Sequence, residues 1–456
     1  MPNSSQTFAR SEDGRSFVVA DATGCALVAG SLAVIVSAQR RQLALVEERS
    51  QTSPASLRGR MMGEVLADGI DVRAGYPFDD ATVEMADAAT VQTLHDTTGA
   101  RLDIGVDLTP PGGPARLLPT RFNRHTFWCG QSGSGKTYAL GVVLEQLIAH
   151  TALPVVVFDP NSDFVHLGEL DPQASGPTAD ALRRRDIRVL RPHKGALLRA
   201  RFTELPLPSK AAILRIDPIA DREEFNELMH LSTVLSATEL DDTLPHLRSS
   251  ESPAQQRLGM RIENLGLLEW EVWARNQRAV TEVVAERPDA TVLDLGGFST
   301  AEQQLVVALA LLDELWSRRE ERRPILLVID EAHNLASPQL DSPIAVAVRE
   351  RLIQIAAEGR KFGLWLLLST QRPSKVHPNI LSQCDNLALM KMSSPVDLAE
   401  LGTHFGYAPA ALLERSPWFR QGEALFAGGF TPAPTLVAMN ARITREGGTD
   451  VKVPLR

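Results

Sequence analysis

Eight consecutive residues near position 130 carry the clearest chemical signal in the sequence. This glycine-rich run ends in a lysine and a threonine and matches the phosphate-binding pattern G-x-x-x-x-G-K-[ST]. In such a loop the glycines let backbone N–H groups converge on phosphate oxygens, the lysine reaches the outer phosphates, and the hydroxyl binds Mg²⁺. The sequence therefore predicts binding of ATP and Mg²⁺, with Thr137 as a metal ligand. The predicted nucleotide-binding residues are Gly130, Gln131, Ser132, Gly133, Ser134, Gly135, Lys136 and Thr137.

An apolar run that ends in two acids gives the second signal. Ile325–Ile329 is entirely aliphatic, and Asp330 and Glu331 follow directly. A buried strand of this kind places the first carboxylate beside the metal, so Asp330 is predicted to support Mg²⁺. Glu331 is then predicted to polarise a water aimed at the γ-phosphate, which indicates hydrolysis rather than binding alone.

Further polar positions around the last apolar run, Leu364–Thr370, are candidates with an ordinary structural alternative. Gln371 follows this run and is predicted to sense the γ-phosphate, although a strand-capping residue has the same pattern. Arg360 precedes the run and is predicted to reach a neighbouring subunit's phosphate. A solvated helix end, where basic residues favour the helix dipole, is the other interpretation. On the loop after Gln371, Arg372 and Lys375 are candidates for lining a DNA pore.

These residues need elements that position them, and the pattern along the chain supplies two kinds. Residues 1–115 contain short strand-like runs separated by turn residues, which favours a small β-barrel. Residues 116–440 alternate continuous apolar strands with helical patterns, which predicts a doubly wound α/β domain. The family resemblance given below implies that it is a RecA-like P-loop domain. Within this domain, residues 203–287 are predicted to form a helical insertion. Residues 441–456 are polar and charged and are predicted to form a C-terminal tail.

The composition excludes several classes of protein. The chain has 456 residues, 44% of them hydrophobic, which is ordinary for a globular protein. A net charge of −9 argues against a polycation that coats nucleic acid. Three scattered cysteines give no zinc or disulfide pattern. We find no secretory signal and no apolar stretch long enough for a bilayer, so the expectation is a cytoplasmic protein without membrane insertion.

Taken in order, the motifs resemble the HerA/VirB4-type branch of the HerA–FtsK ATPases. The likeness extends from about residue 100 to about residue 430 and is far more specific than a phosphate-binding loop alone. It rests on the runs LDIG from Leu102, RFNRHT from Arg121, the phosphate-binding loop, DP and DF from Asp159 and Asp163, IDEAHN, EGRKFG, STQRPSKVHPNILSQC and QGEA from Gln421.

The resemblance implies a ring-forming ATPase, typically a homo-hexamer, that moves along double-stranded DNA. It implies Glu331, Gln371 and Arg360 as the catalytic set, with Arg360 acting on the neighbouring subunit. It also implies a nuclease or another effector as partner, in DNA end processing or antiphage defence. Two alternatives stay open: an ATP-gated scaffold ring that activates an effector enzyme, and a VirB4-like secretion or conjugation ATPase.

Overall fold

The computed structural model describes residues 7–37, 40–50, 52–234 and 240–447. The chain forms two compact units. The first unit contains Met1–Thr151, Gln371–Ser374 and Cys384–Arg442, and the second contains Ala152–Thr370, Lys375–Gln383 and Ile443–Arg456.

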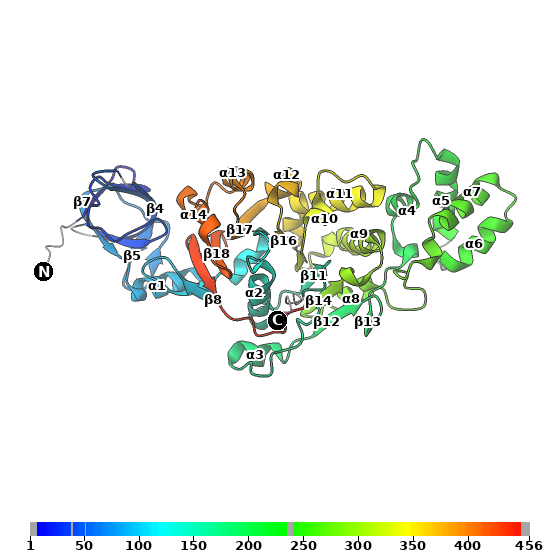
Figure 1. Cartoon of the computed structure of the whole chain (residues 1–456), viewed down its shortest axis with the longest axis horizontal. Coiled ribbons are helices and arrows are strands. Elements are labelled where there is room, and N and C mark those ends of the chain that lie inside the picture. The colour runs from blue at the N-terminus through cyan, green and yellow to red at the C-terminus, as the bar shows by residue number, and fades with distance from the viewer. Residues whose placement is uncertain (1–6, 38–39, 51, 235–239, 448–456) are drawn as a thin grey trace, which may run out of the picture. The chain divides into compact units, whose positions relative to one another are not determined.

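The first unit begins with a closed antiparallel barrel, as the sequence predicts (Figure 1). Alternation of exposed and buried residues along its first two strands turns Phe17 and Val19 into the interior. Pairing of β2 with β5 closes the ring, so these strands leave no open edge between them. The strands are β1 (Phe8–Ser11), β2 (Ser16–Val19), β3 (Leu32–Val36), β4 (Arg41–Ser50), β5 (Ser56–Val65), β6 (Ile70–Asp71) and β7 (Phe78–Met85).

The rest of the first unit contains strands in the order β10-β17-β18-β19-β8-β9. β10 and β17 are parallel, and the other neighbours are antiparallel. The strands are β8 (Leu102–Asp107), β9 (Gly113–Leu117), β10 (His125–Cys129), β17 (Cys384–Met390), β18 (Glu423–Gly428) and β19 (Thr435–Met439). Its helices are α1 (Ala88–Thr98), α2 (Lys136–His150), α13 (Pro395–His404) and α14 (Ala410–Leu413). Although β8 lies inside the predicted N-terminal domain, it pairs with β19 and not with the barrel. The predicted domain bounds themselves stay a prediction.

The second unit is built on a fully parallel sheet in the order β13-β12-β14-β11-β15-β16. The strands are β11 (Val155–Asp159), β12 (Ile187–Arg191), β13 (Ala196–Leu197), β14 (Ala290–Asp294), β15 (Ile325–Ile329) and β16 (Leu364–Thr370). Every residue of β11, β14 and β15 is buried, as expected for strands covered on both faces. The helices that accompany the sheet are α3 (Pro177–Leu182), α8 (Val280–Ala285), α9 (Ala301–Ser317), α10 (His333–Ala336), α11 (Pro343–Glu358) and α12 (Pro378–Leu381). The α/β fold predicted from the sequence is confirmed.

Between β13 and α8 the chain forms a group of helices, shown in green in Figure 1. They are α4 (Leu207–Leu214), α5 (Arg222–Val234), α6 (Leu240–Ser249) and α7 (Pro253–Asn264). The described apolar side chains Leu228, Leu247 and Leu258 are buried, and Arg261 pairs with Glu224 at 2.7 Å. This helical group falls within the predicted insertion at residues 203–287.

The predicted C-terminal tail is described up to Gly447, and residues 448–456 lie outside the described part. In the second unit Asp171 N–H donates to Ile443 O at 2.8 Å, and Arg445 N–H donates to Glu169 O at 2.8 Å. Backbone hydrogen bonds therefore hold the beginning of this segment. In the described part of the chain, no helix has both the length and the apolar character needed to cross a bilayer.

Candidate nucleotide-binding site

The predicted phosphate-binding loop connects a buried strand to a long helix. β10 ends at Cys129 and α2 begins at Lys136, so residues 130–135 form the loop. Gly133 and Gly135 have φ values of 76° and 86°, a left-handed conformation that side chains disfavour. The first N–H groups of α2 have no partner within the helix, and they lie at the positive end of its dipole. The local geometry thus suits an anion such as phosphate.

Two other segments of the first unit hold the loop in place. Gln131 N–H donates to Lys391 O at 2.8 Å, and Ser393 N–H donates to the Gln131 side-chain oxygen at 3.1 Å. On the other segment, Gly422 N–H donates to Ser134 O at 3.0 Å. The loop conformation is therefore set by contacts with residues far away in the sequence.

The side chains of the loop divide into buried and exposed groups. Lys136 and Ser134 are only 5% and 1% exposed, whereas Ser132 is exposed and Thr137 is half-buried. A lysine at this position of a phosphate-binding loop can reach the outer phosphates. Among the described residues, no hydrogen-bond partner is found for the Ser134 hydroxyl. Burial raises the pKa of the neighbouring Cys129 thiol, so this cysteine stays protonated.

In the second unit, buried carboxylates gather where parallel strands end. Asp159 is the last residue of β11 and Asp330 follows β15, and they are 0% and 1% exposed. The two strands are hydrogen-bonded neighbours, so their carboxyl ends lie at the same edge of the sheet. Glu331, which is 5% exposed, comes next in the chain. We call Asp159, Asp330 and Glu331 the acidic edge.

Hydrogen bonds fix two of these carboxylates. Ser369 Oγ donates to Asp330 Oδ1 at 2.7 Å. Asp159 accepts from the backbone N–H groups of Asp163 and Phe164 at 2.9 and 2.8 Å. Burial nevertheless raises the pKa of Asp159 to about 7, and the nearby Asp330 charge adds to this shift. A cation close to Asp159 would favour the charged form of this carboxylate.

Glu331 has a backbone conformation that is uncommon for residues other than glycine. Its φ is 44°, in the left-handed region. Its Oε2 lies 3.2 Å from His333 Nδ1, and the same nitrogen lies 3.1 Å from Thr370 Oγ1. Strained backbone persists where the surroundings over-determine it, and such positions cluster at functional sites. The carboxylate thus contacts His333 on its own turn, and His333 in turn contacts Thr370 at the end of β16.

The other predicted site residues lie in different places. Gln371 directly follows β16 and belongs, with the exposed Arg372, to the first unit. Lys375 is exposed in the second unit, where its Nζ donates to Gln339 Oε1 at 3.1 Å. The structure therefore does not gather the predicted set in one unit, since the phosphate-binding loop and Gln371 lie in the first, whereas Asp330, Glu331 and Arg360 lie in the second.

Arg360 lies at the opposite edge of the sheet from Glu331. It is in the short 3-10 helix Gly359–Phe362, just before β16, whereas Glu331 follows the neighbouring parallel strand. The five paired residues of β15 rise about 17 Å between the two edges. Arg360 is half-buried, and its Nη2 donates to Gln383 O of the same chain at 3.0 Å. Within one chain, Arg360 does not meet the acidic edge.

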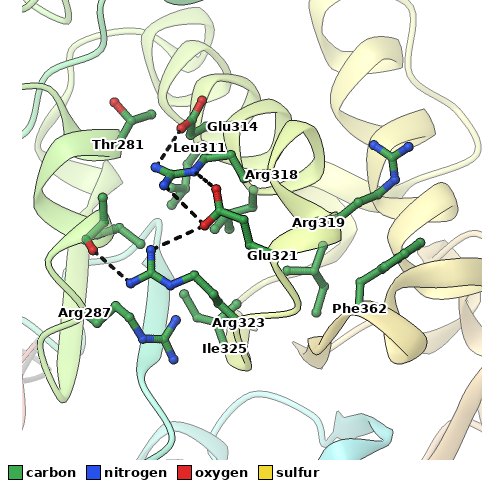
Figure 2. A pocket seen from close by; sticks show the side chains of 14 residues that line it. Thr281, Arg287, Leu311, Glu314, Arg318, Arg319, Glu321, Arg323, Ile325 and Phe362 are labelled. Atoms are coloured by element: carbon green, nitrogen blue, oxygen red, sulfur yellow. Dashed lines mark hydrogen bonds and ion pairs between the residues drawn. The ribbon is translucent and has the colours of Figure 1, made fainter.

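A separate cavity of about 50 Å³ lies near that opposite edge (Figure 2). Ile325 and Leu364, the first residues of β15 and β16, line it. Figure 2 shows Arg318 directed toward Glu321, to which its Nε donates at 2.7 Å. Because Asp330 follows the far end of β15, this cavity is distinct from the acidic edge.

Sequence reasoning did not identify the residues that support the site. Ser369 lies within an apolar strand run, and nothing in its spacing marks it as the donor to Asp330. The segments at Lys391–Ser393 and Gly422 touch the loop only because β17 and β18 bring them there. QGEA, which contains Gly422, was part of the family resemblance, and this was the one available signal.

Part of the chain is similar to known helicases. Residues 112–315 match the family described as "Helicase HerA, central domain". A probable helicase of Methanocaldococcus jannaschii is 32% identical over 152 residues, which are 32% of this chain and 29% of the relative. The DNA double-strand break repair helicase HerA of Sulfurisphaera tokodaii is 29% identical over 35% of this chain and 33% of its own length. HerA of Saccharolobus solfataricus is 23% identical over 80% of this chain and 73% of its own length.

Among solved structures, VirB4 of Thermoanaerobacter pseudethanolicus matches 75% of this chain and 97% of its own, with a TM-score of 0.50 and 16% identity. That likeness concerns the fold. The first two relatives are matched over no more than a third of their own length. Residues 112–315 are therefore similar to the central domain of HerA helicases, and the fold of the chain is similar to that of VirB4.

Proposed function

We propose that the chain is an ATP hydrolase that acts as a ring-forming, double-stranded DNA translocase of the HerA type. The observation that carries the proposal is the complete phosphate-binding loop at the N-terminus of α2 together with the buried pair Asp330 and Glu331 after β15. A loop alone would support nucleotide binding. The buried glutamate next to a metal-type aspartate supports hydrolysis.

The oxygen donors fit Mg²⁺. Thr137 offers a hydroxyl and Asp330 a carboxylate, and hard cations of this kind prefer oxygen ligands. In the described ranges no group of three or more His, Cys, Asp or Glu is placed to hold a metal ion. Mg²⁺ in nucleotide sites is usually bound by one or two protein groups together with phosphates and water. When bound, Mg²⁺ neutralises charge that develops on the phosphate oxygens.

The site residues have separate roles in the proposed reaction. Lys136 and the N–H groups of the loop bind the phosphates, and Gln371 senses the γ-phosphate. Glu331 accepts a proton from water as the water oxygen attacks the γ-phosphorus, and the bond to the leaving ADP oxygen breaks. The contact between Glu331 and His333 holds the carboxylate in one orientation for this step.

Arg360 supports a ring because it lies away from the acidic edge of its own chain. An arginine at the far edge of the sheet does not meet the acidic edge of its own chain, so its proposed partner is the phosphate of a neighbouring copy. We therefore propose a homo-hexamer in which Arg360 acts in trans. Arg372 and Lys375, both exposed, are proposed to contact DNA phosphates in the ring channel, with a nuclease or another effector as partner.

The first test is Glu331→Gln, compared with Lys136→Ala. We expect Glu331→Gln to bind ATP with near-normal affinity and to hydrolyse it at least a hundred-fold more slowly. Lys136→Ala should lose ATP binding. Hydrolysis by Glu331→Gln at the wild-type rate would refute the catalytic assignment. Duplex DNA should stimulate the wild-type ATPase, whereas a scaffold ring would respond to its protein partner and not to DNA.

A mixing experiment tests the action of Arg360 in trans. Arg360→Ala and Lys136→Ala should each be inactive alone. In mixed rings, an intact Lys136 site can receive an intact Arg360 from its neighbour, so part of the ATPase activity should return. Absence of any recovery in mixed oligomers, shown to be mixed by differential tags, would argue against the shared site.

A further inference from the structure

Three large apolar side chains stand out by their exposure among the described residues. Ile219 is 84% exposed, Trp418 is 79% exposed and Val396 is 72% exposed, whereas the next is 55% exposed. Single exposed aliphatic residues are common on protein surfaces. An exposed tryptophan is less common, because its ring has the largest apolar area of any side chain and its exposure to water is unfavourable.

Trp418 and Val396 lie on the two segments that hold the phosphate-binding loop. Trp418 ends the short 3-10 helix Ser416–Trp418, and Gly422, four residues later, donates its N–H to Ser134 O. Val396 follows Ser393 by three residues, and Ser393 donates its N–H to the Gln131 side chain. Ile219, in contrast, lies on the second unit beside the helical group.

Hydrogen bonds of Ser416, two residues before Trp418, also fix the backbone of this segment. Ser416 is fully buried, and its Oγ donates to Met390 O at 3.0 Å and to Met392 O at 3.3 Å. These carbonyls lie at the end of β17, directly before Lys391 and Ser393, which contact the loop. The backbone that carries the indole is therefore anchored to the same strand end as the backbone that carries Val396.

Chain geometry limits how far the backbone of these two residues can lie from the residues that contact the loop. Four residues span at most about 14 Å and three at most about 11 Å, which limits the distances from Trp418 to Gly422 and from Val396 to Ser393. When the phosphates of a nucleotide lie on the loop, the ribose and base extend away from it. The exposed apolar side chains next to the loop are then the available surface for a flat, weakly polar ring.

We propose that Trp418, supported by Val396, is the platform on which the purine base of the bound nucleotide stacks. This inference rests on the proposed function, because it assumes that the loop binds the triphosphate. An indole is suited to this role because base–aromatic stacking needs no hydrogen-bond pattern and is favourable with any purine. The platform contributes to affinity and makes no contact with the reacting γ-phosphate.

The test compares a ligand that has a base with one that has none. ATP and inorganic tripolyphosphate share the phosphates, and their binding to the full-length protein is measured by calorimetry. We expect Trp418→Ala to weaken ATP binding about ten-fold and to leave tripolyphosphate binding unchanged. Trp418→Phe should retain most of the affinity for ATP. Val396→Ala should weaken ATP binding by a smaller factor.

Controls separate failure of this inference from failure of the proposed function. Ile219→Ala removes an equally exposed side chain elsewhere and should leave both ligands unchanged. If Trp418→Ala binds ATP as tightly as the wild type, or loses ATP and tripolyphosphate equally, the platform is refuted. If the wild-type protein binds neither ligand, the proposed nucleotide site itself is wrong.

Discussion

Ser369 Oγ lies 2.7 Å from Asp330 Oδ1, and both residues are almost completely buried. The two side chains come from neighbouring strands, β16 and the end of β15. A hydroxyl that donates to one carboxylate oxygen fixes the rotation of the carboxylate. The orientation of the other carboxylate oxygen, Asp330 Oδ2, is then fixed as well. Metal ligands are typically oriented in this way by a neighbouring hydrogen-bond donor.

The first prediction follows from this pair. Ser369→Ala should raise the Mg²⁺ concentration needed for half-maximal ATPase activity by about 10-fold or more, because the Asp330 carboxylate loses its orienting donor. A Mg²⁺ titration at saturating ATP measures the effect. Ser317→Ala, on the exposed end of α9, is the matched control. An unchanged Mg²⁺ requirement in Ser369→Ala would show that Asp330 needs no such support.

The second prediction concerns a buried ion pair behind the phosphate-binding loop. Glu145, on α2, and Arg442 are 3% and 1% exposed at the side chain, with Oε1 and Nε 3.9 Å apart. Glu145→Ala should lower the free energy of unfolding by about 3–5 kcal/mol, because Arg442 keeps a buried charge without its carboxylate. Denaturant unfolding followed by circular dichroism measures it. Glu321→Ala, which breaks an exposed pair with Arg318, should cost less than about 1 kcal/mol.

A double variant makes the second prediction sharper. If the pair interacts as described, Glu145→Ala combined with Arg442→Ala should cost less than the sum of the two single changes. Strict additivity would mean that the two groups do not interact. The nucleotide affinity of the single variants should also fall, because α2 carries Lys136 and Thr137 at its first turn.

Much of the fold was predictable because its signals are local. The run Ile325–Ile329 is continuous and apolar because both faces of its strand are covered. A buried strand can therefore be predicted from these residues alone. The phosphate-binding loop can also be predicted from the sequence, because the left-handed backbone at Gly133 and Gly135 favours glycine. The barrel, the α/β sheet and the family resemblance all follow from patterns of this kind.

What was not predictable depends on contacts between distant residues. Nothing local in Leu102–Asp107 indicates that it pairs with Thr435–Met439, more than 300 positions later. The hydroxyl of Ser369 acquires its role only through the register of β15 and β16. The type of Arg360 and the family resemblance predict a role for it, but its place at the edge opposite Glu331 depends on the parallel pairing of β15 and β16.

The third prediction tests how tightly the phosphate-binding loop is packed. A Cβ at Gly130 would lie 2.8 Å from Met390 Cβ and 2.8 Å from Ser134 Oγ, whereas a Cβ at Gly133 would meet nothing within 4 Å. Gly130→Ala should therefore displace the loop and weaken ATP binding strongly. Gly133→Ala should cause only backbone strain, which raises the free energy of the loop conformation by about 1–3 kcal/mol. Calorimetric titration of both variants with ATP measures the difference, and a larger loss of affinity in Gly133→Ala would contradict it.

The last prediction concerns pH and Asp107, at the end of β8. Its Oδ1 accepts from Thr109 N–H at 2.8 Å and Thr109 Oγ1 at 2.6 Å. Burial outweighs these donors and raises the pKa of Asp107 to about 6. Between about pH 4 and pH 6, the folded chain keeps a proton that the unfolded chain releases, so this group lowers the free energy of unfolding as the pH rises. Above pH 6 both states are ionised and the penalty is constant.

Asp107→Asn removes that titration while leaving an oxygen that accepts from Thr109. The variant should therefore be more stable than the wild type at pH 7, by about 1–2 kcal/mol after allowance for partial exposure of the carboxyl. The two proteins should converge near pH 4, where Asp107 is protonated in the folded state. Denaturant unfolding at pH 4.5, 5.5 and 7.0 gives the difference curve, in which other carboxylates cancel. A difference that stays constant across this range would show that Asp107 titrates normally in the folded protein.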